Sequence, residues 1–232
     1  MVKIVRKKVL NPSVTLLEVE APLIAKKARA GQFIILRVDE HGERIPLTIA
    51  DYDREKGTVT IIFQKVGLTT ELLGDLKEGD SIRDFVGPLG LPTELPEGAK
   101  RVCVVGGGVG CAIAYPQAKS LHAQGIQVDV IAGFRSKDIV ILEEEFKAAC
   151  DNLYLTTDDG TYGEKGFVTD KLKSLIDAGK PVRCGHRHRA HHHDEVCCRR
   201  DQALWDQDYR LSQPHYDRRH RHVRRLPGHR GR

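Results

Sequence analysis

Apolar and polar residues alternate along the first 98 residues in six short runs, which Gly, Pro, Asn and Asp separate. Alternation places successive side chains on opposite faces of a strand, so each run predicts a half-buried β-strand. Six strands at this spacing are typical of a small antiparallel barrel or sandwich. The runs are KIVRKKVL, VTLLEVE, QFIILRV, RIPLTIAD, GTVTIIFQ and DSIRDFV. One helix, Thr69 to Leu76, interrupts them; we expect it to cross a barrel end, with Thr69 or Thr70 as its N-cap.

The hydrophobic period changes after residue 99, where buried apolar strands alternate with amphipathic helices. This alternation predicts a parallel sheet with right-handed crossovers. The predicted strands are RVCVVGG, IQVDVIAGF and NLYLTTDDG, and the predicted helices are GVGCAIAYPQAKSLHAQG, KDIVILEEEFKAAC and GFVTDKLKSLIDAG. Ligands in such sheets bind at the carboxyl ends of the strands. Three segments fall there: Gly106–Gly110, Gly133–Arg135 and Thr157–Gly160.

The glycine-rich loop Gly106-Gly107-Gly108-Val109-Gly110 is the strongest of these candidates. Glycines permit a tight turn and let backbone N–H groups approach a pyrophosphate at a helix N-terminus. The loop departs from G-x-G-x-x-G because Cys111 takes the place of the last glycine. Nor does an acid stand at the tip of the second strand, where a ribose would be held. The loop therefore predicts a dinucleotide or another phosphate ligand.

Two further segments in the barrel half suggest chemistry. Arg44-Ile45-Pro46-Leu47-Thr48 combines a cation, a rigid proline and a hydroxyl, which could hold a phosphate and a ring. Lys65–Thr70 places a glycine before a hydroxyl-rich helix start, which exposes N–H groups and a helix dipole to an anion. The ordinary alternatives are a solvated strand arginine and a simple helix cap. Three cysteines in apolar surroundings are expected to be small core residues: Cys103, Cys111 and Cys150.

Composition fits a globular protein, with 40% hydrophobic and 30% charged residues. The first residues lack the continuous apolar run of a signal peptide, and no stretch is long enough to span a bilayer. We therefore expect a cytoplasmic protein without a membrane partner. Six cysteines without a secretory signal argue against a disulfide framework.

The net charge of +5 hides a break in composition near Lys180. Nine of the eleven histidines lie between His186 and His229, and no lysine, isoleucine or phenylalanine follows Lys180. The chain is therefore divided into a barrel (1–98), an incomplete α/β nucleotide-binding domain (99–182) and an Arg/His-rich, non-native tail (183–232). The tail has too little apolar content to form a core, so we expect disorder there.

The motifs R-x-P-L-T in a barrel and G-G-G-V-G at the start of an α/β domain resemble the ferredoxin–NADP reductase superfamily. Within it, RIPLTIADYD, GPLG and GGGVGCAIAYPQAKSL are most similar to flavin subunits of bacterial electron-transfer complexes. These subunits include the small subunit of NADH-dependent ferredoxin:NADP oxidoreductase and the electron-transfer subunit of dihydroorotate dehydrogenase B. The resemblance covers residues 1 to about 182.

The resemblance implies FAD and either NAD(H) or NADP(H) as cofactors, with hydride transfer from nicotinamide to flavin. Arg44 would pair with the FAD pyrophosphate; Pro46, Leu47 and Thr48 would line the isoalloxazine, with the Thr48 hydroxyl at its reactive nitrogen as the catalytic group. The FAD phosphates would contact Gly67, Thr69 and Thr70. The dinucleotide would lie on Gly106, Gly107, Gly108, Val109 and Gly110, with help from Arg135, Asp158 and Asp159. Electrons would then pass to an iron–sulfur centre, and the implied partners are a larger subunit and ferredoxin.

Such proteins continue with an apolar strand, a Gly-Pro turn and a cysteine-rich segment for a [2Fe–2S] cluster, whose cysteines this sequence lacks. Translating the tail in a frame shifted by one base permits V-I-A-I-G-P-I-I-M-M-K near residues 185–196, and later a C-x-x-C loop suited to such a cluster. We therefore hypothesise a reading-frame slip between about Val182 and Gly185, and we assign no metal to the histidines.

The alternative is a nucleotide-binding domain whose basic tail binds a metal ion or nucleic acid. Against it, the tail lacks regular ligand spacing and holds only three aromatic residues, Trp205, Tyr209 and Tyr216. We therefore expect no nucleic-acid partner. NAD against NADP stays open, as does the choice between pyrimidine synthesis and ferredoxin-linked electron transfer.

Overall fold

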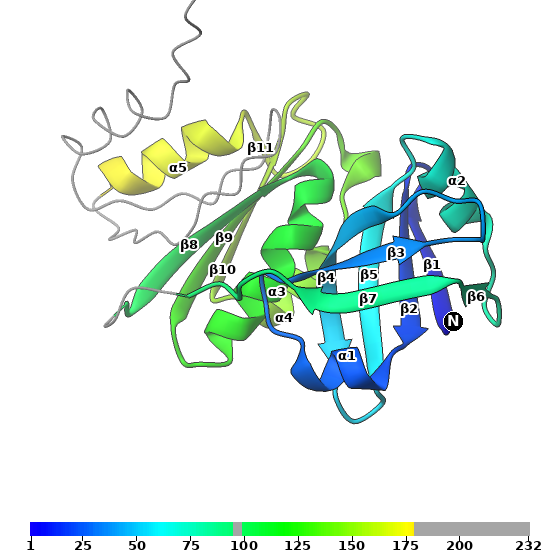
Figure 1. Ribbon diagram of the computed structural model, residues 1–232. Helices are drawn as coiled ribbons and strands as arrows, with labels where there is room; N and C mark the ends of the chain where they lie inside the picture. The colour runs from blue at the N-terminus through cyan, green and yellow to red at the C-terminus, as the bar shows by residue number, and fades with distance from the viewer. Residues whose placement is uncertain (95–98, 179–232) are drawn as a thin grey trace, which may run out of the picture. The chain divides into compact units, whose positions relative to one another are not determined.

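The computed structural model describes residues 1–94 and 99–178 of the chain (Figure 1). The described residues belong to a single compact unit, so the predicted domain boundary at residue 98 stays a prediction. The histidine-rich tail, its expected disorder and the proposed frame slip all lie outside the described residues.

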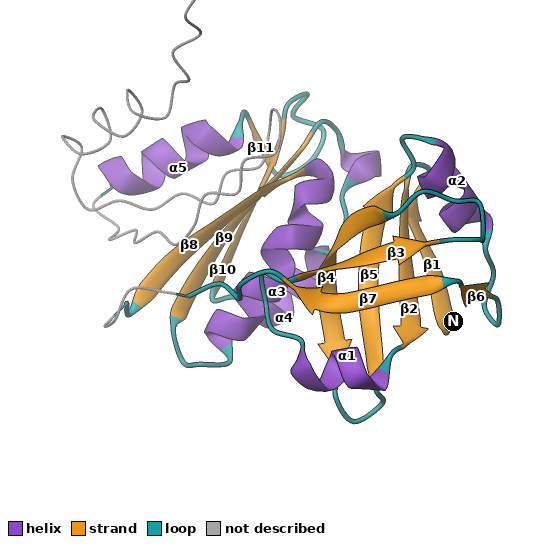
Figure 2. Ribbon diagram, in the orientation of Figure 1, coloured by secondary structure: helices purple, strands orange, loops and turns teal. Residues whose placement is uncertain are grey.

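The N-terminal half forms an antiparallel sheet that curls into a nearly closed barrel, in the strand order β6-β1-β2-β5-β4-β3-β7 (Figure 2). Its strands are β1 (Val2–Asn11), β2 (Val14–Glu20), β3 (Phe33–Arg37), β4 (Ile45–Asp53), β5 (Thr58–Gln64), β6 (Ser81–Ile82) and β7 (Asp84–Leu89). The predicted fold class is thus confirmed, but the count of six strands is wrong. The last predicted strand divides at Arg83, because Ser81 and Ile82 pair with β1 whereas Asp84 onward pairs with β3.

Two helices accompany the barrel, α1 (Pro22–Lys27) and α2 (Leu68–Asp75). Helix α1 was not predicted, although Pro22 at the first helical position is a recognised start signal. Helix α2 lies where a helix was expected, but its N-cap is Gly67 rather than Thr69 or Thr70. Buried side chains fill the barrel core, among them Ile4, Leu17, Ile34, Ile49 and Ile61.

The C-terminal half contains a parallel sheet in the order β11-β10-β9-β8. Its strands are β8 (Arg101–Gly107), β9 (Gln127–Phe134), β10 (Asn152–Thr157) and β11 (Glu164–Lys165). Its helices are α3 (Cys111–His122), α4 (Glu143–Ala149) and α5 (Val168–Asp177). Alternate residues of β8 serve the two faces: Val102 and Val104 join the α3 and α4 side, and Cys103 and Val105 join the α5 side.

The predicted helix over residues 137–150 is only partly correct. A 3₁₀ turn occupies Lys137–Ile139, and α4 begins only at Glu143. Between them Ile141 and Leu142 are buried in the core, and Leu142 has a left-handed φ of 60°. Burial of this apolar run against the sheet replaces the first helical turns. None of the helices in the described part of the chain is long and apolar enough to cross a membrane.

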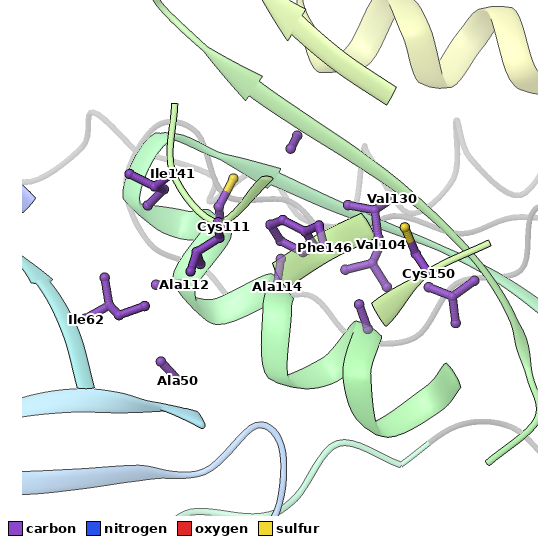
Figure 3. Packing of buried hydrophobic residues seen from close by; sticks show 14 of the residues in the cluster. Ala50, Ile62, Val104, Cys111, Ala112, Ala114, Val130, Ile141, Phe146 and Cys150 are labelled. Carbon is purple, nitrogen blue, oxygen red and sulfur yellow. The ribbon is translucent and has the colours of Figure 1, made fainter. Parts of the chain in front are cut away.

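The barrel and the α/β half share one hydrophobic cluster (Figure 3). Ala50 and Ile62 of the barrel pack with the α3 residues Cys111, Ala112 and Ala114. All three cysteines within residues 99–178 are buried, so their interpretation as core residues is confirmed. Burial raises the pKa of the Cys150 thiol to about 11, with a smaller effect from Asp151.

Candidate functional site

The parallel register brings the three candidate segments of the α/β half to one edge of the sheet. Gly107 pairs with Gly133, and Phe134 pairs with Thr157. The next residues are joined by backbone bonds: Asp158 N donates to Phe134 O at 3.0 Å and Asp159 N to Arg135 O at 3.3 Å. The glycine loop, Arg135 and the two aspartates therefore follow three adjacent strand ends.

The glycine loop is a tight connection between β8 and α3. Gly108 has φ of 53°, a left-handed conformation that favours glycine, and Gly108–Gly110 form a 3₁₀ turn before α3. A Cβ on Gly106 would lie 3.1 Å from both Cα of Cys111 and Cβ of Ala114, so a side chain there would push the helix away. A Cβ on Gly108 would meet nothing within 4 Å, which leaves space for a ligand against the backbone. Val109 is half-buried and packs against the shared core.

The loop after β10 is held by its own hydrogen bonds. Asp159 Oδ1 accepts from the N–H and hydroxyl of Thr161 at 2.9 and 2.7 Å, and these bonds lower the pKa of Asp159. The Thr157 hydroxyl donates to the carbonyl of Tyr162. Asp158, Asp159 and Arg135 are all exposed, so their charges are available at the sheet edge.

Arg44 lies just before β4 and is held by a carboxylate. Its Nη2 is 3.0 Å from Oδ2 of Asp84, which also accepts from Nε of Arg37 at 2.8 Å. Partial desolvation opposes ionisation of Asp84, but the hydrogen bond from Arg37 and the charges of Arg37, Arg44 and Arg83 together lower its pKa. Arg44 itself is 60% exposed, so part of its guanidinium faces solvent.

Pro46, Leu47 and Thr48 follow on β4, where they pair with Ile35, Ile34 and Phe33 of β3. Pro46 is exposed, whereas Leu47 and Thr48 are half-buried, and Leu47 packs against the barrel core. Because successive side chains alternate between the two faces of a strand, Pro46 and the Thr48 hydroxyl share the face at which a ring is expected, and Leu47 faces the barrel core.

The N-terminus of α2 is already partly satisfied by its own side chain. The Thr70 hydroxyl accepts from the N–H groups of Val66 and Gly67 at 3.0 and 3.1 Å and donates to Gly67 O at 2.8 Å. Thr70 thus shapes the turn, and an anion would meet the later N–H groups of the first turn together with Thr69. A Cβ on Gly67 would meet nothing within 4 Å.

The two sets of residues are linked, since the 3₁₀ turn of the glycine loop contacts β5 and α3 packs along β4. The chemistry of these residues fits a flavin and a dinucleotide: exposed cations, the hydroxyl of Thr48, and open space beside the backbone at Gly67 and Gly108. Residues 1–94 and 99–178 offer no comparable site for a metal cluster, because they contain no group of three His, Cys, Asp or Glu side chains that could hold a metal ion.

Several residues that organise this region were not predicted from the sequence. Asp84 lies inside a predicted strand, and its contacts with Arg37 and Arg44 depend on the pairing of β7 with β3, which is not a local signal. The pair Asp51–Lys119 joins segments 68 residues apart and left no local signal. Tyr162 donates to Glu143 at 2.9 Å beside the Asp158–Asp159 loop, and only the register reveals that contact.

Comparison with known proteins identifies the family. A protein encoded beside an adh gene in Clostridium beijerinckii, described as uncharacterized, is 54% identical over 183 residues, which cover 76% of this chain and 62% of that protein. A dihydroorotate dehydrogenase B (NAD(+)) electron transfer subunit homolog of Thermotoga maritima is 48% identical over 158 residues, 68% of this chain and 55% of that protein. The dihydroorotate dehydrogenase B electron transfer subunit of Bacillus cereus is 35% identical over 188 residues, 78% of this chain and 72% of its own length.

The chain belongs to the family of dihydroorotate dehydrogenase B electron transfer subunits. The resemblance found in the sequence is thereby confirmed. The chain spans 62% of the length of the Clostridium relative and 55% of the length of the Thermotoga relative. The sequence matches no protein-family model.

Solved structures share the fold of this chain. The structure of an NADH-dependent reduced ferredoxin-NADP oxidoreductase, studied for flavin-based electron bifurcation, superposes with a TM-score of 0.71 at 44% identity over 76% of this chain and 63% of that chain. A ferredoxin-NADP+ reductase from Plasmodium falciparum superposes with a TM-score of 0.59 at 16% identity over 76% of this chain and 80% of that chain, a likeness of fold alone.

Proposed function

We propose that the chain is a flavoprotein electron-transfer subunit that moves electrons between NAD(P)H and an iron–sulfur centre or partner subunit through FAD. The observation that supports it best is that two groups of candidate residues lie on elements that pack against each other. One is β4 with Arg44 and Thr48, and the other is the glycine loop, at the edge of a parallel sheet that packs against β4 through α3. When bound, the two cofactors supply hydride transfer.

The residues of the chain would bind, orient and shield. Arg44 would donate hydrogen bonds from its exposed N–H groups to a pyrophosphate. Pro46 and Leu47 would support the flavin ring, and Thr48 would donate its hydroxyl to the reactive nitrogen. Gly67, Thr69 and the first turn of α2 would receive phosphate oxygens at the positive end of the helix dipole. Gly106–Gly110 would do the same for the dinucleotide, flanked by Arg135 and by the carboxylates Asp158 and Asp159.

We propose two candidate electron acceptors. Relatives named as dihydroorotate dehydrogenase B subunits favour a partner in pyrimidine synthesis. The structural neighbour named as a ferredoxin-NADP oxidoreductase favours a larger flavoprotein partner and ferredoxin. Either form would use a [2Fe–2S] cluster as the next electron carrier, and its cysteines would have to come from outside the described residues.

The test is reconstitution of the purified chain with FAD. We expect one FAD per chain, a visible flavin spectrum and bleaching of that spectrum by NADH or NADPH under anaerobic conditions. The ratio of the two rates would identify the dinucleotide. A folded chain that binds no FAD at micromolar concentrations would overturn the proposal, and zinc retained against a chelator would favour the metal-binding alternative.

A further inference from the structure

The two elements that carry the proposed cofactor residues pack directly against each other. Strand β4 begins next to Arg44 and passes through Thr48, and helix α3 begins at Cys111 directly after the glycine loop. The strand contacts the helix through Ala50 and Asp51. Any shift of one element against the other would therefore move the flavin residues relative to the dinucleotide residues.

A β-bulge shapes this contact. Ile49 pairs with Ile61 and Asp51 pairs with Thr60, so Ala50 is an extra residue on β4. Bulges redirect side chains, and here Ile49 enters the barrel core while Ala50 joins the cluster of α3 (Figure 3). The next side chain, Asp51, also reaches α3. The bulge thus turns two successive residues of the flavin strand toward the dinucleotide helix.

Asp51 meets Lys119 on α3 with good geometry. The Lys119 ammonium lies 2.6 Å from Oδ2 and 2.8 Å from Oδ1 of the carboxylate. It also lies 5.8 Å from the ring centroid of Tyr115, which packs edge-to-face on Phe146 at 5.7 Å. Partial burial disfavours the ammonium, but the hydrogen bond and the charge of Asp51 outweigh it and raise the pKa of Lys119. The Lys119 ammonium therefore lies beside an aromatic ring that is itself held by packing.

We propose that Asp51 and Lys119 are positioning residues, which fix the glycine loop against the flavin strand at the distance that hydride transfer needs. This inference rests on the proposed function and deepens it. Helix α3 connects Lys119 to the loop that precedes Cys111. Pro116 interrupts its hydrogen-bond ladder, but Ala112 and Ala118 on either side of Pro116 are buried in one packed cluster, so a displacement at Lys119 is passed to the loop. Hydride transfer is steep in distance, and a misplacement of about 1 Å can cost on the order of a hundredfold in rate.

The experiment compares five forms of the full chain: wild type, Lys119→Met, Lys119→Arg, Asp51→Asn and the double variant Asp51→Asn/Lys119→Met. The matched control is Lys8→Met, because Lys8 and Glu145 also join the two halves with similar exposure but belong to β1 and α4. One readout is the anaerobic rate of flavin reduction by NADH. A second is the long-wavelength absorbance band formed when the dinucleotide stacks on the flavin. A third, without cofactor, is amide hydrogen exchange in peptides 45–53 and 111–122.

We expect Lys119→Met and Asp51→Asn each to slow flavin reduction by on the order of tenfold and to weaken the band, with FAD content unchanged. The double variant should be no slower than either single one, since the pair acts as a unit. Lys119→Arg should recover most of the rate. Exchange should rise in both peptides for Lys119→Met and not for Lys8→Met.

Three outcomes overturn the inference alone: equal rates for Lys119→Met and Lys8→Met, losses that add in the double variant, or exchange that rises without a change in rate and band. If the wild type binds FAD and NADH does not reduce it, the proposed function fails instead. In that case unchanged exchange in Lys119→Met would also remove the structural basis of the pair.

Discussion

The guanidinium of Arg44 donates to the carboxylate of Asp84 across 3.0 Å. The side chain expected to hold a pyrophosphate is thus already oriented by the acid at the start of β7. Asp84 also accepts from Arg37, so the carboxylate is fixed from a second direction. A ligand phosphate would find Arg44 in place, with part of its guanidinium exposed.

Removal of the Arg44 charge should weaken FAD binding. For Arg44→Met we expect a loss of about 1.5–3 kcal/mol of binding free energy, the range for a charge-assisted hydrogen bond, or roughly 10- to 150-fold in Kd. Fluorescence titration of the apoprotein with FAD measures it. Arg83→Met is the matched control, because Arg83 lies nearby and pairs with Glu40 at 3.0 Å instead. Equal losses in both variants would show that only net charge matters.

Asp84 should contribute stability that depends on pH. Its pKa in the folded chain is lowered from 3.8, so its contribution is complete above that value and is lost as pH falls through the lower folded-state pKa. Wild type should therefore exceed Asp84→Asn in unfolding free energy at neutral pH, and the difference should shrink below pH 3.8. Urea unfolding from pH 7 to pH 2.5 tests the sign. A difference that grows toward acid would contradict it.

Glycine substitutions should separate folding from binding. Gly67 has an extended φ of −169° and open space around its Cβ position, so Gly67→Ala should leave Tm within a few degrees. The added methyl would nevertheless stand where a phosphate approaches, and we expect FAD affinity to fall by about tenfold, or about 1.4 kcal/mol. Gly106→Ala should instead lower Tm, since its Cβ would crowd Cys111 and Ala114. Thermal melts with and without FAD distinguish the two effects.

Much of this fold could be predicted because its signals are local. Alternation in VTLLEVE and continuous apolar runs such as RVCVVGG specify β2 and β8 from a few residues each. The division of DSIRDFV into β6 and β7 could not be predicted, because it depends on which distant edge strand each half meets. The same holds for the site: the glycine loop is a sequence motif, whereas the pairing of Arg44 with Asp84 and of Asp51 with Lys119 is a product of tertiary packing.

A buried ion pair at the opposite edge of the parallel sheet should dominate local stability. Arg101 and Asp129 lie 2.7 Å apart, the Asp129 side chain is 2% exposed, and Asn152 donates to its second oxygen at 2.7 Å. Asp129→Ala would leave a largely buried guanidinium without its carboxylate, which costs roughly 3–5 kcal/mol. We expect that loss in denaturant unfolding, with FAD affinity of the folded fraction unchanged. A loss below about 1 kcal/mol would mean that Arg101 finds solvent by a small movement.

The reading-frame hypothesis has a structural prediction of its own. Strand β8 stands at one end of the four-stranded order, and its second edge has no strand partner within residues 99–178. An apolar strand encoded in the shifted frame would pair there and extend the sheet beyond β8. We expect a chain with the frame restored to slow amide exchange in peptide 101–107 by at least tenfold and to unfold at a higher temperature. The coding DNA decides first: if no one-base shift near codons 182–185 yields the apolar strand and the C-x-x-C loop, the hypothesis is wrong.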